Sequence, residues 1–450
     1  MIQLPLIDSQ SEVPLYRQLY EGLKGNILAG QLLDGDRLPP TRDLAQQLGL
    51  NRATVSAAYA LLEEDGLANG QVGRGSFVQN KALGQQKEIS FSTSRPAEEL
   101  FPLEEVREVT AEVMRLSAAQ VLQLGSPLGY GPLRTFLMEE AIGEGVFDPD
   151  EDDLLITSGC QQALDLIHKA LIGPGGLVYT EEPVYPGVRN VFQRDLTVDP
   201  NQSGIEAMIV TPSFRNPTGY TMSLSERREI AESARVGRRL LIEVDIYARL
   251  RYEGEALPTI RALGARTQAL LLRSFSKIAF PGLRVGWVIG PKALIQKLAT
   301  AKQWTDLHSD QLSQAILLEF ARSGKLDAHL ARVLDAGRIR LATTIEMLER
   351  VLPEGSQFTR PQGGMNLWVT LPRGCDSGAV LEKARRHGVS YLPGRYFSVS
   401  APMNESFRLS FAGLSPARIV EGLKRLGPLF EEEAKIASRY QDPLPEMAMV

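Results

Sequence analysis

The chain has 450 residues, a length that predicts two or three domains rather than one. Its hydrophobic content of 43% and charged content of 23% are typical of a globular protein and exclude a disordered or fibrous chain. The net charge of −5 does not indicate nucleic-acid binding, so a DNA-binding function would have to depend on where the basic side chains lie.

The cysteines and histidines give no sign of a metal centre or a disulfide framework. Cys160 and Cys375 lie far apart without a CxxC pair, as expected in a reducing cytoplasm. The four histidines are scattered without metal-ligand spacing. The first residues lack the basic start and apolar run of a signal peptide, and no stretch approaches the roughly 20 apolar residues of a membrane span. We therefore expect a cytoplasmic protein with no metal site and no membrane contact.

The first 79 residues contain helical and extended segments in an order typical of one small domain. Thr41 and Asn51 are candidate caps for the second and third helices. A short glycine turn joins these two helices, and a second glycine-rich turn joins the two extended pieces. This pattern predicts a winged helix-turn-helix. The expected elements are helices over 14–30, 41–48 and 51–64, then extended pieces at 67–68 and 76–78.

The third helix of a winged helix lies in the major groove, where its first residues face base edges. Here these residues include Asn51, Arg52 and Thr54. Arginine binds guanine and asparagine binds adenine through paired hydrogen bonds, and short side chains let the backbone approach. Arg42 begins the second helix and Arg74 lies at the tip of the wing, so both are placed to reach phosphates. Ordinary surface charge is the alternative for any one of these arginines, but their joint placement favours DNA contacts.

The segment resembles the GntR-type winged helix. The resemblance lies in Gly35–Ala45, in Asn51–Val55 and in Gly73–Val78. In that family the positions matching Arg42, Arg52, Thr54 and Gly73 contact DNA. The resemblance therefore implies double-stranded DNA, read as operator half-sites, as a partner.

Residues 80–88 are polar and lack periodicity, so they are expected to form a linker. From Ile89 onward, short apolar runs alternate with helical stretches. Buried strands separated by helices predict a mostly parallel α/β sheet over residues 89–450. The expected strands lie at 153–157, 177–179, 207–210, 240–244, 269–272 and 284–289.

The strongest chemical signal is the string Ser274-Phe275-Ser276-Lys277, followed by Arg284. A lysine just after a buried strand, with hydroxyls beside it and an arginine further on, suits an aldehyde cofactor that carries a phosphate. Lys277 would form the Schiff base with the aldehyde. Ser274, Ser276 and Arg284 would bind the phosphate dianion through charge-assisted hydrogen bonds.

Further polar residues follow other predicted strands. Asp245 ends an apolar run, the usual position for a ligand contact in an α/β sheet, and would hold a pyridine nitrogen protonated. Tyr247 and Asn216 could donate to a phenolic oxygen on the same ring, and Tyr185 could stack on it. The turn that opens a helix after residue 157 would attract the phosphate; it contains Ser158, Gly159 and Cys160.

Each of these residues also has a purely structural explanation. Asn216 could form a turn, Tyr185 could pack half-buried, and Gly159 could start a helix. Their occurrence together, in this order along the chain, favours a cofactor site.

Residues 89–430 resemble the fold type I enzymes that use pyridoxal 5'-phosphate, in the class I aminotransferase group. A GntR-type domain on such a body is the organisation of the MocR subfamily of bacterial regulators. The resemblance implies that Lys277 forms the internal aldimine, and that Arg408 binds the α-carboxylate of a ligand. It also implies a homodimer, and a smaller part of the body at about 330–450.

Two departures from the family pattern concern the ligand site. The family has a Tyr-Gly-Asp-Pro stretch whose tyrosine reaches the phosphate in the partner subunit, whereas this chain has Leu124-Gly125-Ser126-Pro127. Residues 186–210 are also shorter than is typical of the family.

Two functions are compatible with the sequence. In the first, the chain is a regulator of transcription that senses an amine, an amino acid or the cofactor itself through Lys277. In the second, Lys277, Asp245 and Arg408 make a working aminotransferase with an appended winged helix. The intact start of the third helix and the wing arginine favour the regulator, because transamination requires neither.

Overall fold

The structure is a computed structural model, and it describes residues 7, 11, 13–28, 32, 35–71, 75–78 and 88–441. The chain divides into two compact units, Met1–Glu88 and Ile89–Val450. Of the predicted features, Gly73, Arg74 and nearly all of the linker lie outside the described residues.

The first unit holds three helices and a β-hairpin, as the sequence predicts. The helices bury one apolar face each around Leu23, Leu44 and Leu62. The hydroxyl of Tyr59 donates to the backbone oxygen of Pro39 at 2.8 Å, which fixes the third helix against the start of the second. The elements are α1 (Leu15–Leu28), α2 (Thr41–Leu48), α3 (Arg52–Glu64), β1 (Ala68–Gln71) and β2 (Gly75–Val78), with the two strands antiparallel.

One of the two predicted caps is confirmed. The side-chain oxygen of Asn51 accepts from the backbone nitrogen of Ala53 at 3.0 Å and so begins α3. The prediction that Thr41 caps α2 is wrong, because Pro40 occupies the cap position and no side chain bonds the helix end. Pro40 has an extended backbone with φ −54° and ψ 138°, which places Thr41 inside the first turn.

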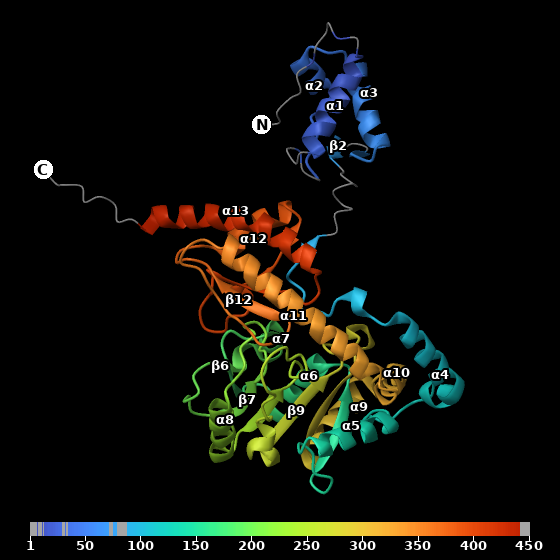
Figure 1. Cartoon of the computed structure of the whole chain (residues 1–450), viewed down its shortest axis with the longest axis vertical. Helices are drawn as coiled ribbons and strands as arrows, with labels where there is room; N and C mark the ends of the chain where they lie inside the picture. The colour runs from blue at the N-terminus through green and yellow to red at the C-terminus, as the bar shows by residue number, and fades with distance from the viewer. Residues whose placement is uncertain are drawn as a thin grey trace, which may run out of the picture. The chain divides into compact units, whose positions relative to one another are not determined.

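The centre of the second unit is a β-sheet with helices around it (Figure 1). The sheet has seven strands, in the order β4-β10-β9-β8-β7-β5-β6. All neighbouring pairs are parallel except those made by β10, which runs antiparallel to β4 and β9. The predicted mostly parallel sheet is therefore confirmed. The strands are β4 (Asp152–Thr157), β5 (Leu177–Thr180), β6 (Leu196–Thr197), β7 (Ile205–Val210), β8 (Leu240–Val244), β9 (Ala269–Ser274) and β10 (Gly286–Pro291).

Alternate side chains of these strands enter different cores, which is why the strands are almost continuously apolar. Leu155 packs with α6 and α9 on one face, whereas Leu154 and Ile156 pack with α5 and α10 on the other. The helices around the sheet are α4 (Leu103–Val121), α5 (Gly131–Gly143), α6 (Cys160–Ile167), α7 (Pro186–Phe192), α8 (Leu224–Gly237), α9 (Lys292–Asp306) and α10 (Gln311–Arg322).

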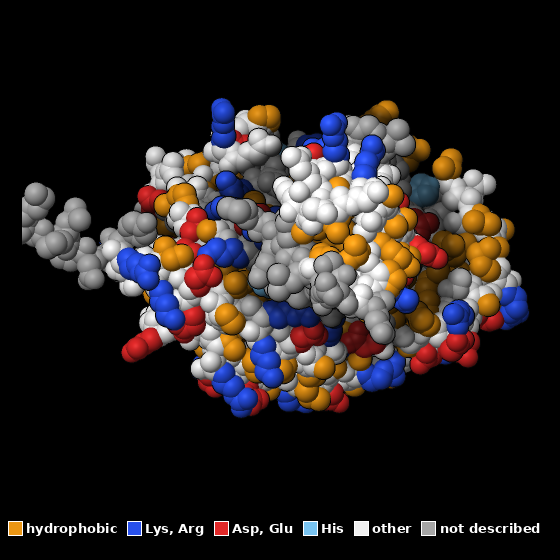
Figure 2. Space-filling view, turned by 90° about the horizontal axis from the view of Figure 1, so that it is seen from above, with side chains coloured by type: hydrophobic (Ala, Val, Ile, Leu, Met, Phe, Trp, Pro, Cys, Tyr) orange, Lys and Arg blue, Asp and Glu red, His pale blue; other side chains and the backbone are white. Residues whose placement is uncertain are grey.

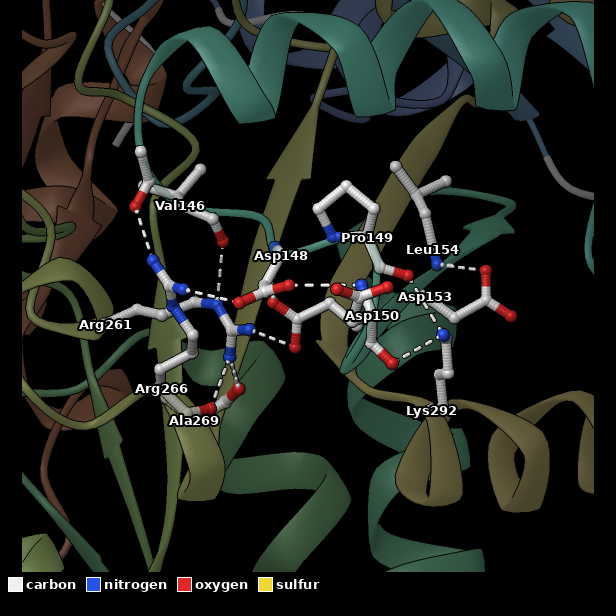
Figure 3. Close-up of polar contacts among 12 residues, drawn as sticks. Val146, Asp148, Pro149, Asp150, Asp153, Leu154, Arg261, Arg266, Ala269 and Lys292 are labelled. Atoms are coloured by element: carbon white, nitrogen blue, oxygen red, sulfur yellow. Dashed lines mark hydrogen bonds and ion pairs between the residues drawn. The ribbon is translucent and has the colours of Figure 1, made fainter.

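A buried arginine ties together the amino ends of two parallel strands, β4 at the edge of the sheet and β9 within it (Figure 3). Arg261 is 1% exposed and pairs with Asp152, the first residue of β4, at 2.5 Å. It also donates to the backbone oxygens of Val146, at 3.0 Å, and of Ala269, the first residue of β9. A buried charge is tolerated only with such a full set of partners. The network fixes the sheet at the amino ends of these strands, and the predicted site lies at the carboxyl ends of the strands.

The last part of the unit is a smaller antiparallel sheet in the order β11-β12-β15-β14. Its strands are β11 (Gln357–Phe358), β12 (Asn366–Thr370), β14 (Leu392–Pro393) and β15 (Ser406–Ser410), and its helices are α11 (Lys325–Val351), α12 (Ser377–Arg386) and α13 (Pro416–Gln441). β3 (Ile89–Ser90) pairs in parallel with β13 (Val389–Ser390). The first residues after Glu88 thus belong with this smaller part, although the sequence placed it only at about 330–450.

Among the helices that the structure describes, none is both long enough and apolar enough to cross a membrane.

Candidate functional site

A cavity of about 430 Å³ lies in the second unit, and most of the predicted site residues line it. Ser274 ends β9, and Asp245 follows β8 directly, so the carboxyl ends of parallel strands converge there. The predicted residues in its lining are Cys160, Tyr185, Asn216, Tyr247, Ser274, Ser276, Lys277, Arg284 and Arg408. Ser158, Gly159 and Asp245 stand behind this lining. The first two contact Arg284 directly. Asp245 lines a second, adjoining cavity of about 460 Å³ together with Arg249 and Arg273.

Arg284 is held at the start of α6 by the backbone. Its guanidinium donates to the backbone oxygen of Ser158 at 2.9 Å. Gly159 has φ +88°, and a Cβ there would lie 2.5 Å from the Arg284 guanidinium. Only glycine allows both this backbone conformation and this close approach. The arginine fork is therefore fixed where the amide groups of α6 begin, an arrangement suited to an anion.

Two hydroxyls complete this anion site, and we call Arg284, Ser274, Ser276 and the start of α6 together the phosphate cradle. Ser274 Oγ lies 3.1 Å from Ser276 Oγ, and Arg284 reaches Ser276 Oγ at 3.4 Å. Cys160 begins α6 beside them, and burial raises the pKa of its thiol to about 12, so it stays neutral. The donors present are a guanidinium, hydroxyls and a helix end, which is the set that binds a phosphate dianion.

Lys277 follows β9 and points into the same cavity. Its Nζ donates to the backbone oxygen of Ser94 at 2.6 Å. Burial, together with the charges of Arg408 and Arg284, lowers the pKa of Lys277 to about 8. The neutral amine, the form that attacks a carbonyl carbon, is therefore more abundant near neutral pH than it would be for an ordinary lysine.

A chain of polar contacts connects the other cavity residues. Asn216 Nδ2 donates to the Tyr247 hydroxyl at 3.4 Å, and Asn216 Oδ1 accepts from Arg408 at 3.0 Å. Arg408 is 3% exposed, and burial lowers its pKa to about 10. The Tyr185 ring lies at the mouth of the cavity, 43% exposed, and its edge packs on the backbone of Gly187.

The segment Ser92–Ser94 also lines the cavity, and sequence reasoning missed it. The Ser92 backbone oxygen accepts from Arg408, and the Ser94 backbone oxygen accepts from Lys277. These contacts use carbonyl groups, which every residue has, so no side-chain pattern could have revealed them.

Arg273 was missed as well. Its Nε lies 3.1 Å from Asp245 Oδ2, so the predicted carboxylate has a cationic partner within the protein. An arginine inside an otherwise apolar strand was a signal that could have been noticed.

The predicted DNA-contacting residues that the structure describes belong to the first turn of α2 and to the start of α3. Arg42 and Arg52 are exposed, and neither makes an ion pair within the described part of the chain. Thr54 is partly exposed on the first turn of α3. Asn51 is exposed, but its side-chain oxygen already caps α3, so a paired contact with adenine would require breaking that cap.

Comparison with known proteins identifies both units. Residues 87–426 match the model of aminotransferase class I and II. The chain belongs to this family. Residues 15–78 match the gntR family of bacterial regulatory proteins, which bind DNA. An aminotransferase body behind a GntR-type domain is the organisation of the MocR subfamily, and the prediction of this subfamily is confirmed.

Individual relatives cover either the body or the whole chain. Aromatic-amino-acid aminotransferase 1 of Thermococcus litoralis is 35% identical over 370 residues, which are 77% of this chain and 89% of that protein. The uncharacterised HTH-type transcriptional regulator YdfD of Bacillus subtilis is 27% identical over 487 residues, covering 96% of this chain and all of the regulator. The probable rhizopine catabolism regulatory protein MocR of Rhizobium meliloti is 24% identical over 94% of this chain and 95% of its own length.

A solved structure resembles the body. The kynurenine aminotransferase of Pyrococcus horikoshii, crystallised with PMP, superposes with a TM-score of 0.73 at 33% identity. The match covers 78% of this chain and 93% of that enzyme.

The residues of the cavity fit pyridoxal 5'-phosphate. Arg284, Ser274 and Ser276 would hold its phosphate, and the glycine at 159 leaves the room that the cradle needs. Lys277 would hold the aldehyde carbon, and Asp245 would hold the ring nitrogen. When bound, the cofactor supplies an electrophilic carbon and a ring that withdraws electrons.

Proposed function

We propose that the protein is a DNA-binding transcriptional regulator that depends on pyridoxal 5'-phosphate and responds to an amine or amino acid at Lys277. The observation that carries this proposal is the exposed guanidinium of Arg52 at the start of α3, which makes no ion pair with any residue that the structure describes. Transamination does not use it. Relatives that span nearly the whole chain are regulators. On this proposal the protein acts in the cytoplasm, where DNA and the cofactor are both available.

Arg408 is the candidate anchor for the ligand's carboxylate. It is a buried cation on the cavity wall, and its partners within the described chain are neutral oxygens of Ser92 and Asn216. A carboxylate is a stronger acceptor for a guanidinium than a backbone carbonyl. An amino acid that enters the cavity would therefore displace the Ser92 oxygen.

Displacement of the Ser92 oxygen would allow ligand binding in the cavity to affect the DNA-binding unit. Ser92 follows β3, and β3 begins directly after Glu88, the last residue of the first unit. Phe91 is held by the backbone oxygen of Ser390 at 2.7 Å, so a shift at Ser92 acts on a segment that is anchored on one side. A ligand can bias DNA binding only by its different affinity for two arrangements of such an element.

We propose that a second copy of the chain covers the exposed apolar residues near α4. Figure 2 shows hydrophobic side chains at the end of the second unit where α4 lies. Gln311 donates to the backbone oxygen of Gln123 at 2.6 Å, and Ser309 lies 3.3 Å from Ser158, so this surface adjoins the phosphate cradle. Isolated exposed apolar residues are ordinary, but a group of them marks an interface. The group consists of Leu103, Met114, Leu116, Leu122 and Leu124, each at least 38% exposed.

The proposal is tested by electrophoretic mobility shift of the DNA upstream of the protein's own reading frame. We expect retardation by the cofactor-loaded protein and a changed affinity when amines or amino acids are added. Absence of retardation under all of these conditions would rule out the proposal that the protein is a DNA-binding regulator.

Catalysis by the body is the second candidate. Lys277, Asn216 and Arg408 share one cavity, and Asp245 stands behind it, so the groups that transamination needs are together. Single-turnover reactions with a panel of amino acids test it. Rapid conversion of the bound cofactor to its amine form, with no DNA binding, would make this the main function.

A further inference from the structure

Arg273 is a charged side chain in a central strand of the sheet. It lies in β9 and pairs with Trp287 of β10, and its other strand neighbours are apolar or small. Only 18% of its side chain is exposed. Burial of a guanidinium is costly unless it is fully paired, so the position requires an explanation.

The guanidinium joins two carboxylates on either side. Its Nε lies 3.1 Å from Asp245 Oδ2, and its NH1 lies 2.7 Å from Glu144 Oε2. The Asp245 side chain is 3% exposed, whereas that of Glu144 is 49% exposed. Within the described chain Oδ1 of Asp245 accepts no hydrogen bond. The arginine therefore occupies one oxygen of the buried carboxylate and leaves the other for a ligand.

The surroundings of Asp245 oppose its charge. Burial raises the pKa of Asp245, and Glu144 raises it further, whereas Arg273 and, from α8, Arg227 lower it. Glu243, on the same strand, is fully buried with its pKa raised to about 7 by burial and by Asp245. Arg273 is the cation in direct contact, so it contributes most to keeping Asp245 ionised.

We propose that Arg273 is a positioning residue for the cofactor: it keeps Asp245 ionised, and it fixes the carboxylate so that Oδ1 is available to the ring nitrogen. The inference rests on the proposed cofactor site. The guanidinium contacts the carboxylate directly, and the carboxylate would stand between it and the ring. It therefore stabilises the ionised carboxylate more than it repels a protonated nitrogen. Without it, burial would shift the shared proton from the ring to Asp245.

The inference is tested in the full-length protein loaded with pyridoxal 5'-phosphate that carries ¹⁵N in the ring. The ¹⁵N chemical shift at neutral pH reports whether the ring nitrogen is protonated. The variants are Arg273→Gln and Arg273→Met, with Arg273→Lys keeping the charge. Arg249→Gln is the matched control. Arg249 and Arg273 both line the second cavity of about 460 Å³, but Arg249 pairs with Asp327 and not with Asp245. Borohydride fixation and the melting temperature measure loading and folding separately.

We expect the wild type, Arg273→Lys and Arg249→Gln to give the pyridinium signal. In Arg273→Gln and Arg273→Met the signal should shift toward that of the neutral pyridine, as it should in Asp245→Asn. The ratio of protonated to neutral ring nitrogen should fall about tenfold, which corresponds to one pKa unit. A pyridinium signal in both loaded neutral variants would overturn the inference and leave cofactor binding intact. A wild type that takes up no cofactor would instead overturn the proposed function, and this inference with it.

Discussion

The guanidinium of Arg408 donates to the backbone oxygen of Ser92, and Ser92 belongs to the segment that directly follows the DNA-binding unit. The residue that would anchor a ligand is thus bonded to the strand end by which the body connects to the first unit. On the proposed function, this contact would couple ligand exchange at Arg408 to movement of that segment.

Replacing Arg408 should weaken recognition of ligands that carry a carboxylate but not of simple amines. We expect Arg408→Gln to weaken the response to amino acids by about 10- to 100-fold, since hydrogen bonds to charged groups contribute about 1.5–3 kcal/mol each. The measurement is a titration of the bound cofactor's absorbance. A simple alkylamine without a carboxylate is the control, and its affinity should stay within about twofold, because only one charge pair is lost. Equal losses for both ligands would show that Arg408 does not anchor the carboxylate.

Arg52 should contribute to specific DNA binding. Arg52→Ala is expected to cost about 1–3 kcal/mol of binding to the operator, the range for a paired contact with a base. Fluorescence anisotropy with labelled promoter DNA gives the affinity. Arg107→Ala is the matched control, because Arg107 is an exposed arginine on α4. The idea fails if the two variants bind operator DNA equally well.

Binding to DNA should also fall with salt. The phosphate contacts of a protein release counterions, so affinity for DNA declines linearly on a double-logarithmic plot against salt concentration. Affinity of the wild type that stays constant between about 50 and 200 mM salt would contradict a groove-binding mode.

A charge in the apolar group near α4 should separate the two copies. Leu122 is 70% exposed, and Leu122→Glu is expected to convert a dimer to monomers because the carboxylate would be buried without a partner. Sedimentation equilibrium measures the change. Val236→Glu is the control, since Val236 is 67% exposed on α8, in a different part of the surface. A wild-type protein that is monomeric at micromolar concentration would exclude the dimer.

Cofactor uptake should depend on the protonation of Lys277. Its pKa is lowered to about 8, so the neutral amine predominates above that pH and is scarce below it. The rate of covalent uptake by the cofactor-free protein should therefore rise from pH 7 and level off above about pH 8. Stopped-flow absorbance after mixing with the cofactor gives this rate. A rate independent of pH in this range would show that the amine is not the titrating group.

Local strings in the sequence were sufficient to predict that the hydroxyl and arginine side chains of the proposed phosphate cradle lie together. Ser274, Ser276 and Lys277 share one turn, and Arg284 follows within the next, so their proximity follows from chain connectivity alone. The winged helix was predicted for a similar reason, because helix spacing and glycine turns are local signals. The matching families confirm both assignments at the level of the fold.

The contacts between distant segments could not be predicted. Arg408 meets Asn216 and Ser92 only because the small sheet folds over the ends of the large one. β3 and β13 are two residues long, which is too short for an alternation of apolar and polar residues to be recognised in the sequence. The error at Thr41 had another cause, since the fixed backbone of Pro40 determined where α2 begins.

The central claim is that the DNA-binding unit responds to chemistry at Lys277. The most direct measurement compares the affinity of wild-type protein and Lys277→Ala for promoter DNA, each with and without pyridoxal 5'-phosphate and an amino acid. We predict that these additions change the affinity of the wild type at least tenfold, which corresponds to a coupling of about 1.4 kcal/mol. Lys277→Ala should bind DNA but show no change. An identical response in the variant would contradict the account.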